Sequence, residues 1–265
     1  MSRFLPKHEM ATFRKRGLVS ASVFAVLAVV LFVAIRGATA NDWRTASREP
    51  AGLAPDPAAN AEAVVQVYAA RVWGWRGAFG VHTWIAVKPE NAKSYTVYEV
   101  IGWQLRWNDS ALVVRNRQPD TRWFGNEPDL LVDLRGAQAA KLLAKIDRAA
   151  RDYPWAKEYS AWPGPNSNTF TAWVGRAVPE LRLNLPPTAI GKDYLGGELI
   201  GAAPSGSGGQ VSLGGMFALT ASTVEGLELN LLGLSFGIDP WPPALKLPML
   251  GRVGFPAGVS SGIAE

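Results

Sequence analysis

The feature that most limits the fold is an uncharged, mostly apolar run of nineteen residues at positions 17–35. It follows Arg14, Lys15 and Arg16 and is closed by Arg36. A helix rises about 1.5 Å per residue, so this run would cross roughly 30 Å, the thickness of a bilayer's hydrocarbon core. Basic side chains favour the cytoplasmic side. The sequence therefore predicts a cytoplasmic tail over residues 1–16, a transmembrane helix over 17–36, and export of everything that follows.

A secretory signal peptide is the alternative for this segment. Residues 38–40, Ala-Thr-Ala, match the small-residue pattern of a signal-peptidase cleavage site. The apolar run, however, is longer than the roughly 7–15 residues of a typical signal-peptide core. A retained anchor is therefore the favoured interpretation.

The positive charge belongs to the membrane flank. Residues 1–40 carry six of the 27 basic side chains and one of the 22 acidic ones, which leaves 21 of each sign beyond them. The exported part is thus close to neutral and lacks the electrostatic basis for binding nucleic acid, so no nucleic-acid partner is expected.

Residue types that are missing exclude several chemistries. The chain has no cysteine, which excludes disulfides, thiolate catalysis and thiolate metal sites. Of its two histidines only His82 lies beyond the apolar run, so a zinc site built from several imidazoles is also excluded. Carboxylate-bound calcium or magnesium stays open, although no EF-hand-like loop is present. We expect no metal and no cofactor.

Sequence periodicity predicts an α+β fold. Residues 64–72, 81–88 and 95–103 have the alternation and β-branched content of three strands in an antiparallel meander. Apolar residues at helical spacing predict a helix over 136–153, and a second helix over 166–178 ends before Pro179. We expect an antiparallel sheet with helices packed on one side.

Composition divides the exported part into three stretches. Residues 37–60 form a predicted linker with proline and small residues, 61–200 the α+β core, and 201–265 a hairpin with an extended tail. The hairpin is predicted over 216–223 and 227–238. Glycine and serine make 205–215 a predicted flexible stretch.

The best candidate for chemistry is Ser167, at the start of the second predicted helix and just after a glycine-proline turn. A helix N-terminus presents unpaired N–H groups and a partial positive charge, which stabilise an anionic nucleophile and an oxyanion. His82 could accept the proton of the hydroxyl, and Glu99 on the next strand could orient the imidazole. Serine and Asn166 are also common helix caps, so a purely structural role stays open.

Four stretches carry a resemblance to known families. They are residues 82–88, 98–103, 164–170 and 186–194. With them, the chain from about 64 to 195 resembles an uncharacterised bacterial family classed as a domain of unknown function.

The same stretches are more distantly similar to circularly permuted papain-like hydrolases, such as NlpC/P60 peptidases and relatives of lecithin retinol acyltransferase. Those enzymes often carry Asn-Cys-x-x-Phe at the nucleophile helix. The resemblance places Ser167 at the cysteine position, His82 at the position of the base and Glu99 at the third polar position. Serine departs from that pattern, because a hydroxyl is a much weaker nucleophile than a thiol at neutral pH.

These features predict a single-pass protein of the bacterial inner membrane with a papain-like domain on the periplasmic side. We expect it to hydrolyse or transfer an amide or ester acyl group, with Asn166, Asn168, Trp84 and Trp103 binding the substrate. Peptidoglycan peptides, lipoproteins and lipids are within its reach.

Two other interpretations stay open. The first is a non-catalytic module that binds an envelope ligand on a degenerate papain-like fold. The second is a glycan-cleaving enzyme with tryptophan platforms and two carboxylates. The candidate carboxylates are those of Glu99, Asp120, Glu127, Asp129 and Asp133.

Overall fold

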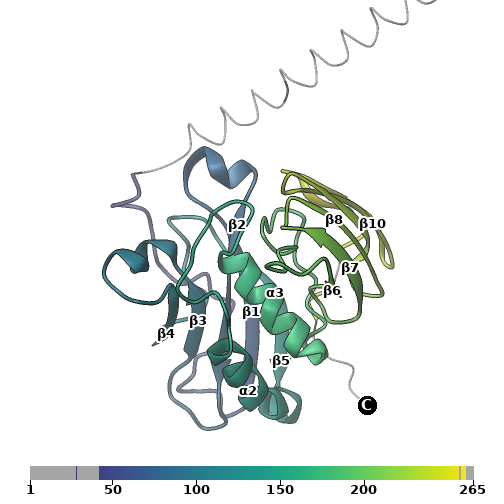
Figure 1. Cartoon of the computed structure of the whole chain (residues 1–265). Helices are drawn as coiled ribbons and strands as arrows, with labels where there is room; N and C mark the ends of the chain where they lie inside the picture. The colour runs from purple at the N-terminus through teal and green to yellow at the C-terminus, as the bar shows by residue number, and fades with distance from the viewer. Residues whose placement is uncertain (1–27, 29–41, 257, 261–265) are drawn as a thin grey trace, which may run out of the picture.

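The computed structural model describes residues 28, 42–256 and 258–260. Residues 42–256 and 258–260 form an α+β fold with two antiparallel sheets and the α-helices α2 and α3. Figure 1 shows how these elements are arranged. The α+β class predicted from the sequence is therefore confirmed. Apart from residue 28, the predicted transmembrane segment lies outside the described residues. Within the described part of the chain, no helix has the length and apolarity needed to span a membrane.

The first sheet has five strands in the order β4-β3-β2-β1-β5. The strands are β1 (Val64–Arg71), β2 (Val81–Lys88), β3 (Thr96–Val100), β4 (Leu112–Asn116) and β5 (Asp129–Arg135). The three predicted strands correspond to β1, β2 and β3, because alternation there reflects a real difference between the two faces of the sheet.

Both helices pack on one face of this sheet. They are α2 (Gly136–Arg151) and α3 (Ser167–Ala177), and both match the predicted helices closely. Apolar side chains such as Ile146 and Phe170 meet Val67 and Ile85 in the larger of two buried clusters. The face of β1 and β2 that carries β-branched residues is thus the one that the helices cover.

The opposite face of the sheet is covered by chain without regular structure. A smaller cluster on that face, with Tyr68 and Trp84 at its centre, packs against Leu53, Ala54 and Trp123. Asp120 accepts hydrogen bonds from the backbone N–H groups of Leu53 and Ala54 at 2.7 and 3.2 Å. Part of the stretch predicted as a linker is therefore a layer of the folded domain.

The second sheet is a seven-stranded meander, in the order β12-β11-β10-β9-β8-β7-β6. Its strands are β6 (Ile200–Ala202), β7 (Gly208–Leu213), β8 (Phe217–Ser222), β9 (Gly226–Leu231), β10 (Leu234–Pro240), β11 (Pro243–Leu247) and β12 (Gly251–Gly254). The predicted hairpin is present as β8 and β9, but its second arm, predicted to run to residue 238, turns back after Leu231 and continues as β10. The predicted flexible stretch and extended tail are wrong, because β7, β11 and β12 form there by pairing with neighbours.

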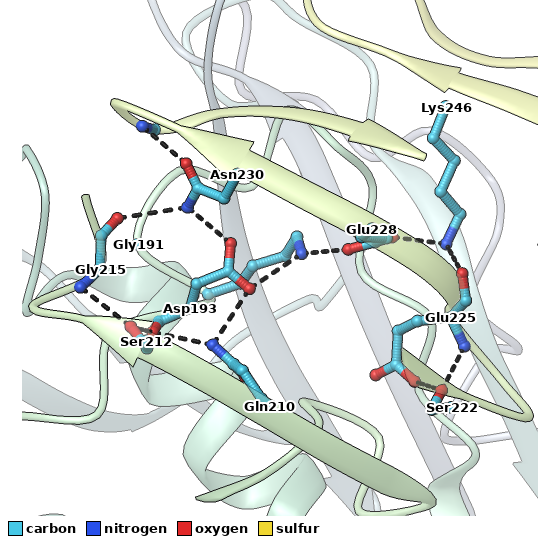
Figure 2. A network of polar contacts seen from close by, with 12 residues as sticks. Gly191, Asp193, Gln210, Ser212, Gly215, Ser222, Glu225, Glu228, Asn230 and Lys246 are labelled. Atoms are coloured by element: carbon cyan, nitrogen blue, oxygen red, sulfur yellow. Dashed lines mark hydrogen bonds and ion pairs between the residues drawn. The ribbon is translucent and has the colours of Figure 1, made fainter. Parts of the chain in front are cut away.

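The second sheet packs against the first part of the chain through polar side chains, which Figure 2 shows. Lys192 forms ion pairs with Asp193 and Glu228, and Lys246 reaches the other oxygen of Glu228 at 2.6 Å. Asn230 donates to Asp193 at 2.7 Å. All five side chains are buried. The contact between the 192–193 segment and the second sheet is therefore made by ion pairs and hydrogen bonds in place of an apolar core.

Candidate functional site

His82 lies near the start of β2, on the face of the sheet that points away from the helices. Its register partner is Ala70, and its ring stacks on Trp123 with 3.8 Å between centroids. Its Nε2 lies 3.3 Å from Oε2 of Glu99. Burial lowers the pKa of His82, and the hydrogen bond and charge of Glu99 oppose that effect only in part. A neutral imidazole that donates its Nε2–H to Glu99 fits this geometry.

Glu99 is fully buried on β3 and is held by two arginines of β4 and the loop after it. Nη2 of Arg115 lies 2.9 Å from Oε1, and Nη2 of Arg117 lies 3.3 Å from Oε2. Burial acts to raise the pKa of Glu99, but the hydrogen bond from His82 and the charge of Arg117 outweigh it and hold the pKa at about 2. The carboxylate is therefore ionised, and both of its oxygens bind a partner.

Ser167 is the first residue of α3, next to a complete capping box. Oδ1 of Asn166 accepts the backbone N–H groups of Asn168 and Thr169 at 2.9 and 3.2 Å, and Oγ1 of Thr169 accepts the N–H of Asn166. The amide of Asn168 also donates to the carbonyl oxygens of Val81 and Ile190. Both asparagines thus hold the start of α3 in place, and the N–H of Asn168, one of the N–H groups at this helix start, is already used.

Thr83, not His82, is the residue of β2 that faces the start of α3. Its Oγ1 lies 3.2 Å from the carbonyl oxygen of Ser167, 3.0 Å from Oδ1 of Asn168 and 2.9 Å from Oγ1 of Thr171. Successive side chains of a strand point to opposite faces. His82 therefore lies on the far side of the sheet from Ser167.

The structure brings together two of the three predicted catalytic residues. His82 and Glu99 are hydrogen-bonded as predicted, whereas within the described residues no hydrogen bond joins Oγ of Ser167 to His82. Ile85 and Val87 share the helix-covered face of β2 with Thr83, whereas His82 shares the opposite, equally buried face with Trp84 and Ala86. Arg115, Arg117 and Trp123 are partners of His82 and Glu99 that sequence reasoning missed.

Comparison with protein-family models gives a match over residues 62–194, to a family described as proteins of unknown function, DUF3750. The chain belongs to the DUF3750 family. The matched region contains the complete five-stranded sheet and both helices, and β6–β12 lie beyond it. No curated protein and no solved structure matches the chain.

Of the residues predicted to bind substrate in this DUF3750 region, one reaches the surface. Asn166, Asn168 and Trp84 are buried, and the indole N–H of Trp84 donates to the carbonyl oxygen of Pro119 at 2.8 Å. Trp103 is 42 % exposed. Its ring lies 5.9 Å from that of Trp123, which in turn stacks on His82. The buried aromatic stack thus supports an exposed indole at its outer end.

Further exposed tryptophans lie at the same end of the first sheet. Trp73 and Trp75 belong to the β1–β2 connection and Trp107 to the β3–β4 connection. In an antiparallel sheet with this strand order both connections emerge at one end. We call Trp73, Trp75, Trp103 and Trp107 the tryptophan end. Arg48 lies beside it, with its guanidinium 5.0 Å from the ring of Phe124, which contacts Trp103.

The carboxylates considered for glycan cleavage have structural partners. Asp120 accepts backbone N–H groups, Glu127 pairs with Arg122, and Asp133 pairs with Arg135. Burial raises the pKa of Asp129. Among the described residues, no cluster of three or more acidic or histidine side chains is arranged to hold a metal ion.

Proposed function

We propose that this DUF3750 protein is a non-catalytic module of the cell envelope that binds lipid on a degenerate papain-like fold and is held at the membrane by its N-terminal apolar segment. The observation that carries the proposal is the position of His82, across the sheet from Ser167 and bonded to Glu99. A serine nucleophile needs a base within hydrogen-bond reach, and no histidine or carboxylate of the described residues is hydrogen-bonded to Oγ of Ser167.

Two further contacts support a non-catalytic role. The N–H groups of Asn168 and Thr169 are taken by the cap on Asn166, so they are not free to stabilise an oxyanion. Glu99 forms ion pairs with two arginines and accepts a hydrogen bond from His82, which is the environment of a structural ion-pair network. The hydrolase or acyltransferase interpretation therefore has less support than the binding module.

The tryptophan end supports lipid as the ligand. Tryptophan is enriched where proteins meet the membrane interface, and arginine pairs well with phosphate. Arg76 and Arg106 lie in the same two connections as the exposed indoles. Residues 37–41 separate the apolar segment from residue 42, so the connection spans roughly 20 Å at most. The carbonyl oxygen of Ser47 accepts the N–H of Gly125, next to Phe124, which contacts Trp103, so the described chain passes beside the tryptophan end at Ser47.

Tryptophan fluorescence of the full chain in nanodiscs tests lipid binding. All eleven tryptophans lie beyond residue 42, so the apolar segment adds no signal. We expect lipids brominated near the headgroup to quench the emission, and Trp107→Phe to reduce the quenching. Trp173→Phe, in the half-buried face of α3, is the matched control and should leave it unchanged. Equal quenching in all three proteins would contradict the proposal, and retention on peptidoglycan sacculi would then favour a cell-wall ligand.

A serine-directed fluorophosphonate probe tests the absence of catalysis. We expect no labelling of the wild-type chain at Ser167. Labelling that is lost in both Ser167→Ala and His82→Ala would show a functional nucleophile and base, and would restore the acyl-transfer interpretation.

A further inference from the structure

The second sheet has the reverse of the usual polarity: its buried face is polar and its exposed face is apolar. Apart from Ala218 and Ala244, the buried side chains on the inner faces of β7–β11 are polar or charged and no more than 3 % exposed. Examples are Gln210, Thr220, Glu228, Asn230 and Lys246. Since these groups satisfy one another and the 183–195 segment, the polar face is the buried one.

The outer face of the same sheet is apolar. Strand register joins its residues into two rows that cross neighbouring strands. One row is Ile200, Val211, Leu219, Leu229 and Phe236, and the other is Leu227, Ile238, Leu245 and Val253. Each of these side chains is between 41 % and 74 % exposed. We call these nine residues the outer apolar face.

Exposure on this scale marks a binding surface. Contiguous apolar patches beyond a few hundred Å² are rare on monomeric soluble proteins and mark sites of interaction. Strands about 4.8 Å apart and residues about 3.4 Å apart give a seven-stranded, six-residue face an outline of roughly 600 Å². Projecting side chains make its accessible area larger, so it reaches the size of a standard interface, about 800 Å² per partner.

The residues of the outer apolar face indicate which kind of partner it can bind. Among the described strands β6–β11, no outward position carries a charged side chain, so the face offers nothing for a charged partner to complement. A shallow hollow lies on it, lined among others by Leu219, Leu229 and Phe236. A two-fold interface joins the same patch on both subunits, and two copies of this uncharged apolar face would meet without opposing like charges.

We propose that the outer apolar face packs against the same face of a second copy of this chain, so that two seven-stranded sheets form a sandwich. Sheets that pack face to face lie about 10 Å apart and interdigitate their side chains. The dimer covers the leucine rows of both copies and leaves the tryptophan end of each copy free. This inference does not depend on the proposed lipid binding, since a different surface carries it.

Cross-linking of single cysteines tests the dimer, because the natural chain has no cysteine to compete. Leu219→Cys, Leu229→Cys and Ile238→Cys, one at a time, are made in the full chain and treated in intact cells with a short bis-maleimide. We expect at least one of them to give a covalent dimer, and co-expression with a longer tagged copy to give the mixed species. Lys141→Cys, exposed on α2, is the control that should stay monomeric.

A second substitution keeps the test decisive. Leu227→Lys, added to each cysteine variant, places a charge within the outer apolar face and is expected to lower the yield of covalent dimer at least tenfold. Leu227→Met should leave this yield unchanged. Reaction of all three cysteines with a water-soluble maleimide as fast as the control would overturn the proposal. So would three cysteines that give no dimer while a fluorophore attached to them is quenched by brominated lipid, because the face would then lie on a membrane. Cross-links only to chains of other mass would equally refute self-association.

Discussion

Replacing Glu99 by glutamine should reveal what the buried network around His82 is for. The change keeps the shape of the side chain and removes its charge, which leaves the largely buried guanidinium of Arg117 without its carboxylate. The pKa of Glu99 is held at about 2, against an ordinary value of 4.5. At about 1.4 kcal/mol per pKa unit, the ionised carboxylate contributes roughly 3 kcal/mol to the free energy of unfolding at pH 7.

The sign of the effect gives the experiment its pH dependence. Because the folded-state pKa of Glu99 lies below the unfolded one, its contribution is complete above pH 4.5 and is lost as the pH falls towards about 2. Urea unfolding followed by tryptophan fluorescence should give Glu99→Gln a deficit of about 3 kcal/mol at pH 7 that shrinks on acidification. Burial also lowers the pKa of His82, so acid destabilises both proteins below pH 6.5 through this residue.

A surface substitution serves as the control. Glu90→Gln, exposed in the turn after β2, should change stability by no more than about 0.5 kcal/mol at either pH. Two results would contradict this reasoning: Glu99→Gln lowers the free energy of unfolding by less than about 1 kcal/mol, or by an amount that does not fall with pH. Either result would show that Glu99 does not stabilise the fold through an ion-pair network. A functional role for the pair with His82 would then need to be reconsidered.

Three other substitutions test the remaining contacts. Asn166→Ala, which removes the cap of α3, should cost about 1–2 kcal/mol in thermal unfolding, while Ser167→Ala should stay within about 0.5; the reverse order would contradict the capping role. Gly175→Ala would place a Cβ 2.5 Å from the carbonyl oxygen of Pro204 and should cost about 1–3 kcal/mol in a urea titration, whereas an unchanged midpoint would show that the contact can relax. Glu228→Gln leaves two buried ammonium groups without their shared carboxylate and should cost about 3–5 kcal/mol, seen as faster proteolysis of the second sheet; unchanged proteolysis would argue against the network.

Elements with a strong period were predictable from the sequence, and those that depend on distant partners were not. β1, β2, α2 and α3 match their predicted ranges because the alternation of the strands and the helical spacing of the apolar residues can be read within each element. The strands after residue 205 are short and interrupted by glycine and proline. They form through pairing with neighbouring strands, and that pairing is not encoded within any single one of them.

The candidate site divides in a similar way. The pairing of His82 with Glu99 was predictable, since neighbouring antiparallel strands bring such residues together. The pairing of His82 with Ser167 depended on which face of β2 receives α3. A shift of one residue along a strand reverses the face. Thr83 therefore took the position that the prediction had given to His82.

Local pattern alone established the α+β class, the position of both helices and the concentration of basic charge around the apolar segment, because these features depend on residues close together in the chain. The choice of buried face needed the folded molecule. Alternation in β7–β11 separates apolar from polar side chains but does not say which set faces inward. Lys192 and Asp193, supplied by a segment far from β9, satisfy Glu228 and Asn230 and so bury the polar set, which leaves the leucines outside.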